Sequence, residues 1–222
     1  MLVRMRVYHF LNRKYGLQNL HRRRLKIATI NALNDPFEMI AAASPNVGVR
    51  AALLKTKDEM DARAGLLCFS RDWHNSVQWA HYADAHRGIC LGFDVRDECV
   101  KAVHYQHDRL RIDPAVIEAE GPEAEVFMQA LISTKSSHWR YENEFRAFLD
   151  LDEPDPETGL FFADFSDNLV LGEAIVGHCS TISRSELADA LGDLAPTVKI
   201  RKARLAFRTF RVVTQRRADM WR

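Results

Sequence analysis

Short strand-like runs that follow one another without an intervening helix constrain the fold of this chain most. Residues 3–10 alternate with the two-residue period of a strand, and compact apolar runs of strand length recur at 65–70 and 88–95. The run 88–95 leads directly into a second strand-like run, 99–106, which predicts a hairpin with its bend at residues 96–98. A regular strand–helix alternation does not produce this order. We therefore expect an α+β fold with a mixed, mainly antiparallel sheet flanked by helices.

The remaining elements follow from periodicity and capping residues. A short helix is expected over residues 14–25, and Asp35, Pro36 and Glu38 resemble a capping box that would start another helix. Further helices are expected at 47–64, at 75–86 capped by Asn75 or Ser76, at 121–135 and at 183–195. Further strands are expected at 24–30, 139–150, 160–165, 173–177 and, as one or two long strands, 197–213.

Length and composition indicate one domain. A chain of 222 residues that is 47% hydrophobic can build one substantial core, so residues 1–222 are expected to form a single domain. The first ten residues have no apolar signal-like core, and no run approaches the roughly 20 apolar residues that span a bilayer. We expect a cytoplasmic protein without membrane contact. Cys68, Cys90, Cys99 and Cys179 are too widely spaced for a zinc ribbon or a disulfide framework.

Charge is balanced overall but unevenly distributed. The net charge is +1, while basic residues gather near both ends of the chain and an acidic loop occupies residues 150–158. Tyr15, Phe207 and Phe210 interleave with the basic residues, a mixture that suits nucleic acid. The candidate contacts to nucleic acid or to a partner protein are Arg22, Arg23, Arg24, Lys202 and Arg204.

Residues 137–150, SHWRYENEFRAFLD, contain two glutamates one residue apart, flanked by arginines. If residues 139–149 form one strand, Glu142 and Glu144 share a charged face and lie roughly 7 Å apart along it. Two fixed carboxylates can stabilise an oxocarbenium-like centre and bind a ribose hydroxyl, so both are candidate catalytic residues. The alternative is an exposed Arg/Glu ladder without chemistry.

The segment 68–93 is unusually rich in polar aromatic residues. Its histidines do not have the four-residue spacing of paired ligands on a helix, so no metal site is expected there. Trp79 and Tyr82 could stack on an aromatic ligand ring, or they could belong to the core. A metal-dependent nuclease or phosphodiesterase that uses Asp35, Glu38 and the central histidines stays open as a second alternative.

Several motifs together identify a family resemblance. These are NDPFE at residues 34–38, CFS at 68–70, WAHYADAHRGICLGF at 79–93 and WRYENEFR at 139–146. They resemble the bacterial family DUF2971, a domain of unknown function, over residues 8–146.

A looser similarity concerns chemistry. A polar residue on the first strand, a strand ending in Phe-Ser and a late Glu-x-Glu are similar to ADP-ribosyltransferases. This resemblance implies that NAD is the co-substrate. It also implies that Glu144 binds the ribose and that Glu142 orients the acceptor. The implied cofactor-binding residues are His9, Arg6, Ser70, Tyr82, Trp79 and Asn34.

Three functions therefore stay open. The first is ADP-ribosyl transfer from NAD onto a macromolecule or a small acceptor, in phage defence. The second is a non-catalytic module that binds nucleic acid or a partner. The third is the metal-dependent hydrolase.

Overall fold

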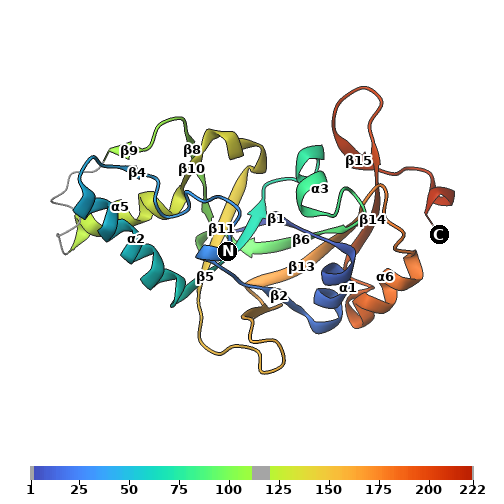
Figure 1. Cartoon of the computed structure of the whole chain (residues 1–222). Helices are drawn as coiled ribbons and strands as arrows, with labels where there is room; N and C mark the ends of the chain where they lie inside the picture. The colour runs from blue at the N-terminus through green and yellow to red at the C-terminus, as the bar shows by residue number, and fades with distance from the viewer. Residues whose placement is uncertain (1–2, 112–120, 222) are drawn as a thin grey trace. The chain divides into compact units, whose positions relative to one another are not determined.

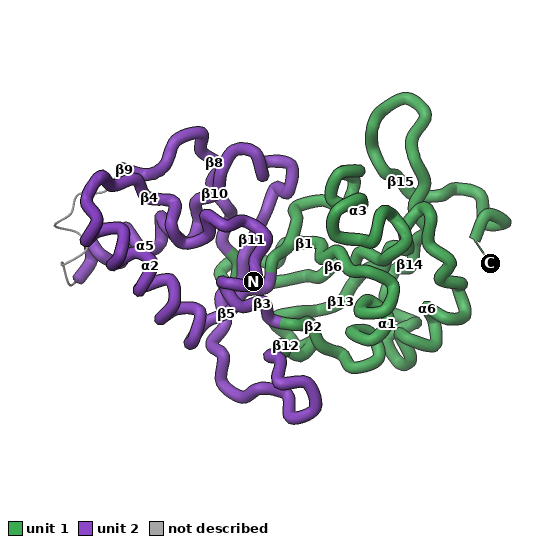
Figure 2. Tube along the Cα trace, in the orientation of Figure 1, with its two compact units in different colours: residues 1–26, 68–100, 162–222 green, residues 27–67, 101–161 purple. Residues whose placement is uncertain are grey.

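The computed structural model describes residues 3–111 and 121–221, and the chain divides into two compact units (Figure 2). Unit 1 comprises residues 1–26, 68–100 and 162–222, and unit 2 comprises residues 27–67 and 101–161. The chain thus crosses between the units several times. Strands and helices in both units confirm the predicted α+β class with mainly antiparallel pairing (Figure 1).

Unit 1 is built on strands in the order β15 (Val212–Thr214), β14 (Lys199–Leu205), β13 (Leu169–Val176), β6 (Ile89–Arg96) and β1 (Arg4–Leu11). Strand β6 is antiparallel to β1 and to β13. β13 and β14 are parallel, and the chain between them contains helix α6 (Arg184–Leu191). A parallel pair requires such a crossover connection. β1 also pairs with the end of β5 (Ala64–Ser70) at Tyr8 and Ser70.

The helices of unit 1 begin at side-chain caps. Asn12 caps α1 (Arg13–Arg22), Asn75 caps α3 (Ser76–Tyr82) and Ser183 caps α6, each by accepting a backbone N–H of the first turn. A core cluster of this unit combines Trp73, Trp79, Ala83, Cys90, Ile175, Ala203 and Val212. Residues of β6, β13 and α3 thus form one apolar interior. A short pair, β2 (Arg24–Lys26) with β12 (Phe162–Asp164), also belongs to this unit.

Unit 2 contains β5 residues 64–67, β11 (Glu144–Asp150) and β7 (Lys101–Ala102), in the order β5-β11-β7, with β3 (Ala28–Thr29) paired to β5. Its long helices are α2 (Val47–Asp61) and α5 (Pro122–Ser133). Two short parallel pairs complete it: β4 (Ala42–Ala43) with β9 (Leu110–Arg111), and β8 (His104–Gln106) with β10 (Thr134–Ser136). Its core includes Ala42, Val49, Leu53 and Leu131.

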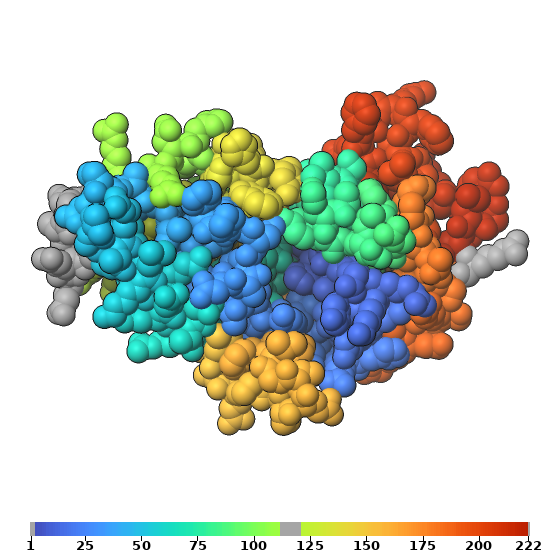
Figure 3. Space-filling model, viewed as in Figure 1, coloured from blue at the N-terminus to red at the C-terminus, as the bar shows by residue number. Residues whose placement is uncertain are grey.

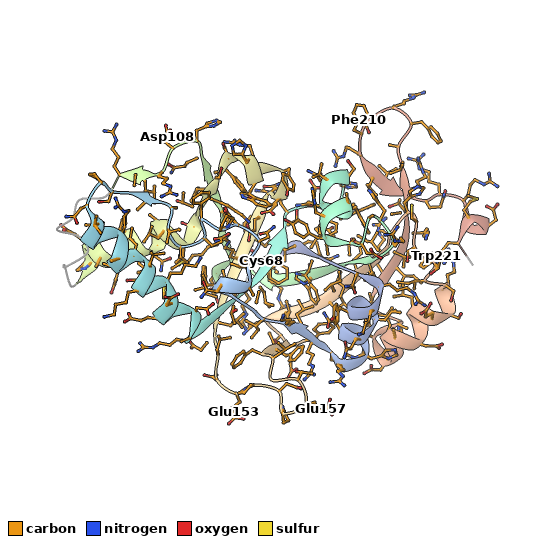
Figure 4. The ribbon with its side chains drawn as sticks, viewed as in Figure 1. Cys68, Asp108, Glu153, Glu157, Phe210 and Trp221 are labelled. Carbon is orange, nitrogen blue, oxygen red and sulfur yellow. The ribbon has the colours of Figure 1, made fainter. Side chains whose placement is uncertain are left out.

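Many expected elements are confirmed within one or two residues. They include β1, β5, β6 and α5 with Pro122 at its start. Helices α1, α2 and α6 also form where they were expected, but each ends three or four residues earlier than predicted. The terminal region 197–213 forms two strands, β14 and β15, and the acidic stretch is a loop on which Glu153 and Glu157 lie (Figure 4).

Three expected elements differ from the structure. Residues 36–39 form a turn, not a helix, because Met39 has a positive φ of 62°, and the Glu38 side chain pairs with Arg146 instead of folding back to cap the turn. The strand expected at 24–30 is broken into β2 and β3. No hairpin joins 88–95 to 99–106, because β7 pairs with β11.

Helix α3 is also shorter than predicted. It ends at Tyr82, and the next residues Asp84, Ala85 and His86 all have positive φ angles. This left-handed run ends the helix six residues before Gly88.

The largest correction concerns residues 139–143, which were expected to begin a strand. They belong to η3, a 3₁₀ segment (Ser137–Glu142), followed by Asn143 in the left-handed conformation with φ 45° and ψ 55°. Strand β11 begins only at Glu144. Glu142 and Glu144 therefore do not alternate along one exposed strand face.

Candidate functional site: a buried charge cluster in unit 2

The turn that precedes β11 positions two glutamates. Ser136 caps η3 by accepting the backbone N–H of His138, and the left-handed Asn143 ends it. Asparagine tolerates this conformation better than most residues. The reversal at Asn143 brings both Glu142 and Glu144 to the same ammonium group, that of Lys135.

The carboxylates of Glu142 and Glu144 are buried together. The two residues are 7% and 5% exposed, although an Arg/Glu ladder would have placed them in water. The Lys135 Nζ donates to Glu142 Oε2 at 2.7 Å and to Glu144 Oε2 at 3.3 Å. Lys135 itself lies on β10 and is buried. Buried charges of this kind are stable only when paired and hydrogen-bonded.

Arg146 completes the cluster and connects it to the NDPFE motif. It is 2% exposed. Its guanidinium donates Nε to Glu144 Oε1 at 2.9 Å, and it holds both oxygens of Glu38 at 2.8 and 2.6 Å. It also donates to the Ile132 carbonyl. We call these five residues, Glu38, Lys135, Glu142, Glu144 and Arg146, the charge cluster.

The electrostatics of the two cations follow from this geometry. Burial alone would lower the pKa of Lys135, but the carboxylates of Glu144, Glu142 and Glu38 outweigh it and raise that pKa. Burial opposes the charge on Arg146 in the same way, and Glu144 and Glu38 raise its pKa above the ordinary value. Both cations therefore stay charged, and the carboxylates are held in fixed positions.

Two aromatic residues adjoin the charge cluster. The Tyr105 hydroxyl accepts the backbone N–H of Glu144 at 2.8 Å, and burial raises the pKa of Tyr105 to about 12. The Lys135 Nζ lies 4.9 Å from the centroid of the Trp139 ring. Since Trp139 is only half-buried, an aromatic surface lies next to the paired carboxylates.

The predicted cofactor-binding residues lie in unit 1, apart from the exposed Asn34 in unit 2. His9 Nδ1 lies 2.8 Å from the Cys68 carbonyl, which can only accept, so Nδ1 carries the proton. Burial lowers the pKa of His9, which favours the neutral form of its ring. The Ser70 hydroxyl donates to the Asp72 carbonyl and accepts from the Gln78 side-chain amide.

Arg6 belongs to a second ionic network, in unit 1. It pairs with both oxygens of Asp94 at 2.6 and 2.7 Å and lies 3.9 Å from Glu173. The buried Glu173 also pairs with Arg201 and accepts from the Tyr8 hydroxyl. Burial and Glu173 raise the pKa of Tyr8 to about 12. The sequence reasoning did not identify this network.

The two aromatic candidates of α3 have different environments. Trp79 has no exposed surface, and its indole N–H donates to the Trp73 carbonyl within the core. Tyr82 lines an open pocket of about 600 Å³, whose other lining residues are Asn12, Arg13, Lys14, His81 and Asp84.

The predicted basic contacts make structural interactions in unit 1. Arg23 donates to the Ala190 and Leu191 carbonyls at the end of α6, and Arg24 stacks on Phe162 at 3.7 Å. Lys202 donates to the Ser180 carbonyl, and burial lowers its pKa. Arg204 donates to the Leu205 carbonyl, while Arg22 is exposed.

Within residues 3–111 and 121–221, no group of three or more His, Cys, Asp or Glu side chains is arranged to hold a metal ion. In the same part of the chain, no helix is both long and apolar enough to cross a membrane. Lys135 was missed by the sequence reasoning, and Glu38 was assigned to a helix cap or a metal. Their one sequence signal was position: Glu38 lies in the NDPFE motif, and Lys135 lies four residues before the WRYENEFR motif.

Comparison with known proteins supports the family resemblance over part of the chain. Residues 78–147 match the model of the family described as "Protein of unknown function (DUF2971)". This match contains four residues of the charge cluster: Lys135, Glu142, Glu144 and Arg146. No curated protein and no solved structure matched the chain.

Proposed function

We propose that the charge cluster serves glycosyl transfer from NAD, with ADP-ribose as the transferred group. The observation that carries this proposal is the burial of Glu142 and Glu144 around one ammonium, in the segment that matches the family model. The looser likeness to ADP-ribosyltransferases in the order of His9, Ser70 and Glu144 points the same way.

The chemistry needs fixed negative charge at one point. When the bond between nicotinamide and ribose breaks, nicotinamide leaves with the bonding electron pair, and positive charge develops on the anomeric carbon and ring oxygen. An acceptor oxygen or nitrogen then bonds to that carbon and loses its proton. A carboxylate that is already oriented stabilises the charge without reorganising, and burial strengthens the interaction.

The two glutamates would have different roles. Glu144 is held by Lys135 and Arg146 through both oxygens, so its position is fixed, and it is assigned to the ribosyl cation. Glu142, at the end of η3, is assigned to orient the acceptor. Trp139 offers a half-exposed ring surface beside the pair for the nicotinamide or adenine ring.

The test is nicotinamide release from NAD, measured by chromatography with the whole chain. Glu144→Gln keeps the shape of the side chain and removes its charge. It should lower kcat about 10²- to 10³-fold with little change in KM, because the lost interaction acts in the transition state. Glu142→Gln should impair transfer to an added acceptor more than hydrolysis.

Glu38→Gln is the matched control, because Glu38 pairs with the same two cations. It should lower thermal stability about as much as Glu144→Gln does, yet keep most of the NAD cleavage at a temperature where both variants are folded. Equal loss of activity in the two variants would reduce the cluster to a structural role. Absence of nicotinamide release by the wild-type chain, together with no heat of NAD binding, would refute the proposal.

A further inference from the structure

The loop between β14 and β15 carries two phenylalanines whose rings are not covered by any of the residues that the structure describes. Phe207 and Phe210 are both fully exposed, more than any other large hydrophobic residue of the described chain. Figure 4 shows Phe210 at the outer end of this hairpin, and the space-filling view shows the segment, in red, projecting from the surface of unit 1 (Figure 3). Exposing two such rings has a cost in water unless a partner covers them.

The stem of the loop is anchored on the rest of unit 1. The Ala206 N–H donates to the Arg211 carbonyl at 3.0 Å and closes the loop 207–210. The Val212 N–H donates to the His74 carbonyl, the His74 ring donates back to the Val212 carbonyl at 2.6 Å, and Arg211 bridges to Asn75. The rings are therefore presented by a fixed backbone, which lowers the entropy cost of binding.

The charge of this region is of one sign. Between Pro196 and Arg217 the sequence has eight Lys or Arg residues and no Asp or Glu. Two of the arginines, Arg208 and Arg211, are exposed and flank the rings as Phe-Arg-Thr-Phe-Arg. A single-sign basic hairpin favours a polyanionic partner.

We propose that the loop 206–211 binds single-stranded nucleic acid, with bases stacked on Phe207 and Phe210 and phosphates paired with Arg208 and Arg211. Alternating rings and cations match the alternation of bases and phosphates along an unpaired strand. A membrane fits less well, because Arg208 and Thr209 lie between the two rings, and inserting both rings would carry the guanidinium toward the hydrocarbon. This surface is independent of the proposed transferase site. It uses two of the aromatic residues that the sequence indicated, but its cations, Arg208 and Arg211, are not among the five basic contacts expected from the sequence.

The experiment is fluorescence anisotropy of a labelled 20-nucleotide oligothymidine with the whole chain, with duplex DNA of equal length for comparison. Phe207→Ala and Phe210→Ala should each raise the Kd about 5- to 150-fold, the range that stacking on one base gives. Arg208→Gln with Arg211→Gln should weaken binding and reduce the slope of log Kd against log salt by about 1.4, because two phosphate contacts are lost.

Phe37→Ala is the matched control, because Phe37 is another exposed phenylalanine with an arginine, Arg109, over its ring. This variant should bind like the wild type, and the melting temperature of the loop variants should be unchanged. Three outcomes would overturn the proposal: no binding of oligothymidine by the wild type, equal affinity of the loop variants, or loop-dependent binding only to vesicles of phosphatidylserine and phosphatidylcholine.

Discussion

Removing the guanidinium at the centre of the charge cluster tests the structural reasoning most directly. Arg146→Met keeps the length and the apolar stem of the side chain but removes hydrogen bonds to Glu38, Glu144 and the Ile132 carbonyl. Two carboxylates would then stay buried with one fewer cation. Breaking a buried ion pair from one side costs about 3–5 kcal/mol, and this site lies at the upper end because Arg146 holds two carboxylates.

The measurement is urea unfolding followed by far-ultraviolet circular dichroism, at low and at high salt. The free energy of unfolding should fall by about 5 kcal/mol in Arg146→Met, and the loss should change little between 0.1 and 1 M salt, because buried pairs are screened weakly. Adding Glu38→Gln to Arg146→Met should recover part of the loss, since it removes one of the charges left without its cation. The exposed pair Arg217–Asp219 gives the control: Arg217→Met should cost under about 1 kcal/mol.

Two results would refute this reasoning. One is a loss below about 1 kcal/mol in Arg146→Met, which would mean that the carboxylates find water or another cation at no cost. The other is a double variant that is less stable than the wild type by the sum of the two single losses, because independent sites behave in that way and members of one network do not.

Two further predictions concern residues that adjoin the cluster. The pKa of Tyr105 is about 12 in the folded state and about 10 in the unfolded chain, so the unfolded state loses its proton first and stability falls as the pH rises from 10 to 12. The stability difference between the wild type and Tyr105→Phe, measured by urea unfolding, should shrink over that interval by up to about 2 kcal/mol; a constant difference would contradict the assigned environment. Asn143→Ala should cost about 1 kcal/mol, because its backbone is left-handed, whereas Asn143→Gly should be nearly neutral in thermal unfolding; equal losses in the two would exclude strain at this turn.

The sequence by itself determined the local elements of this protein. Periodicity and caps located β1, α1, α2 and α6, because side-chain spacing and N-cap hydrogen bonds act over a few residues. Motifs that resemble a known family also singled out the segment around Glu142 and Glu144, and this segment lies within the residues 78–147 that match the family model. Those signals are contained in short stretches of chain, so they can be read without the fold.

Tertiary structure alone decided what the charged residues do. An alternation of Arg and Glu looks the same in sequence whether its side chains face water or the interior. Here the left-handed backbone at Asn143 reverses the chain, and Glu142 and Glu144 are both buried. Glu38 and Arg146 are more than a hundred residues apart, and only the fold brings them into contact. Glu38 left its helix-capping pattern because a bidentate pair with a buried guanidinium is stronger than one cap hydrogen bond. Long-range electrostatics thus overrode a local preference at the site where function is proposed.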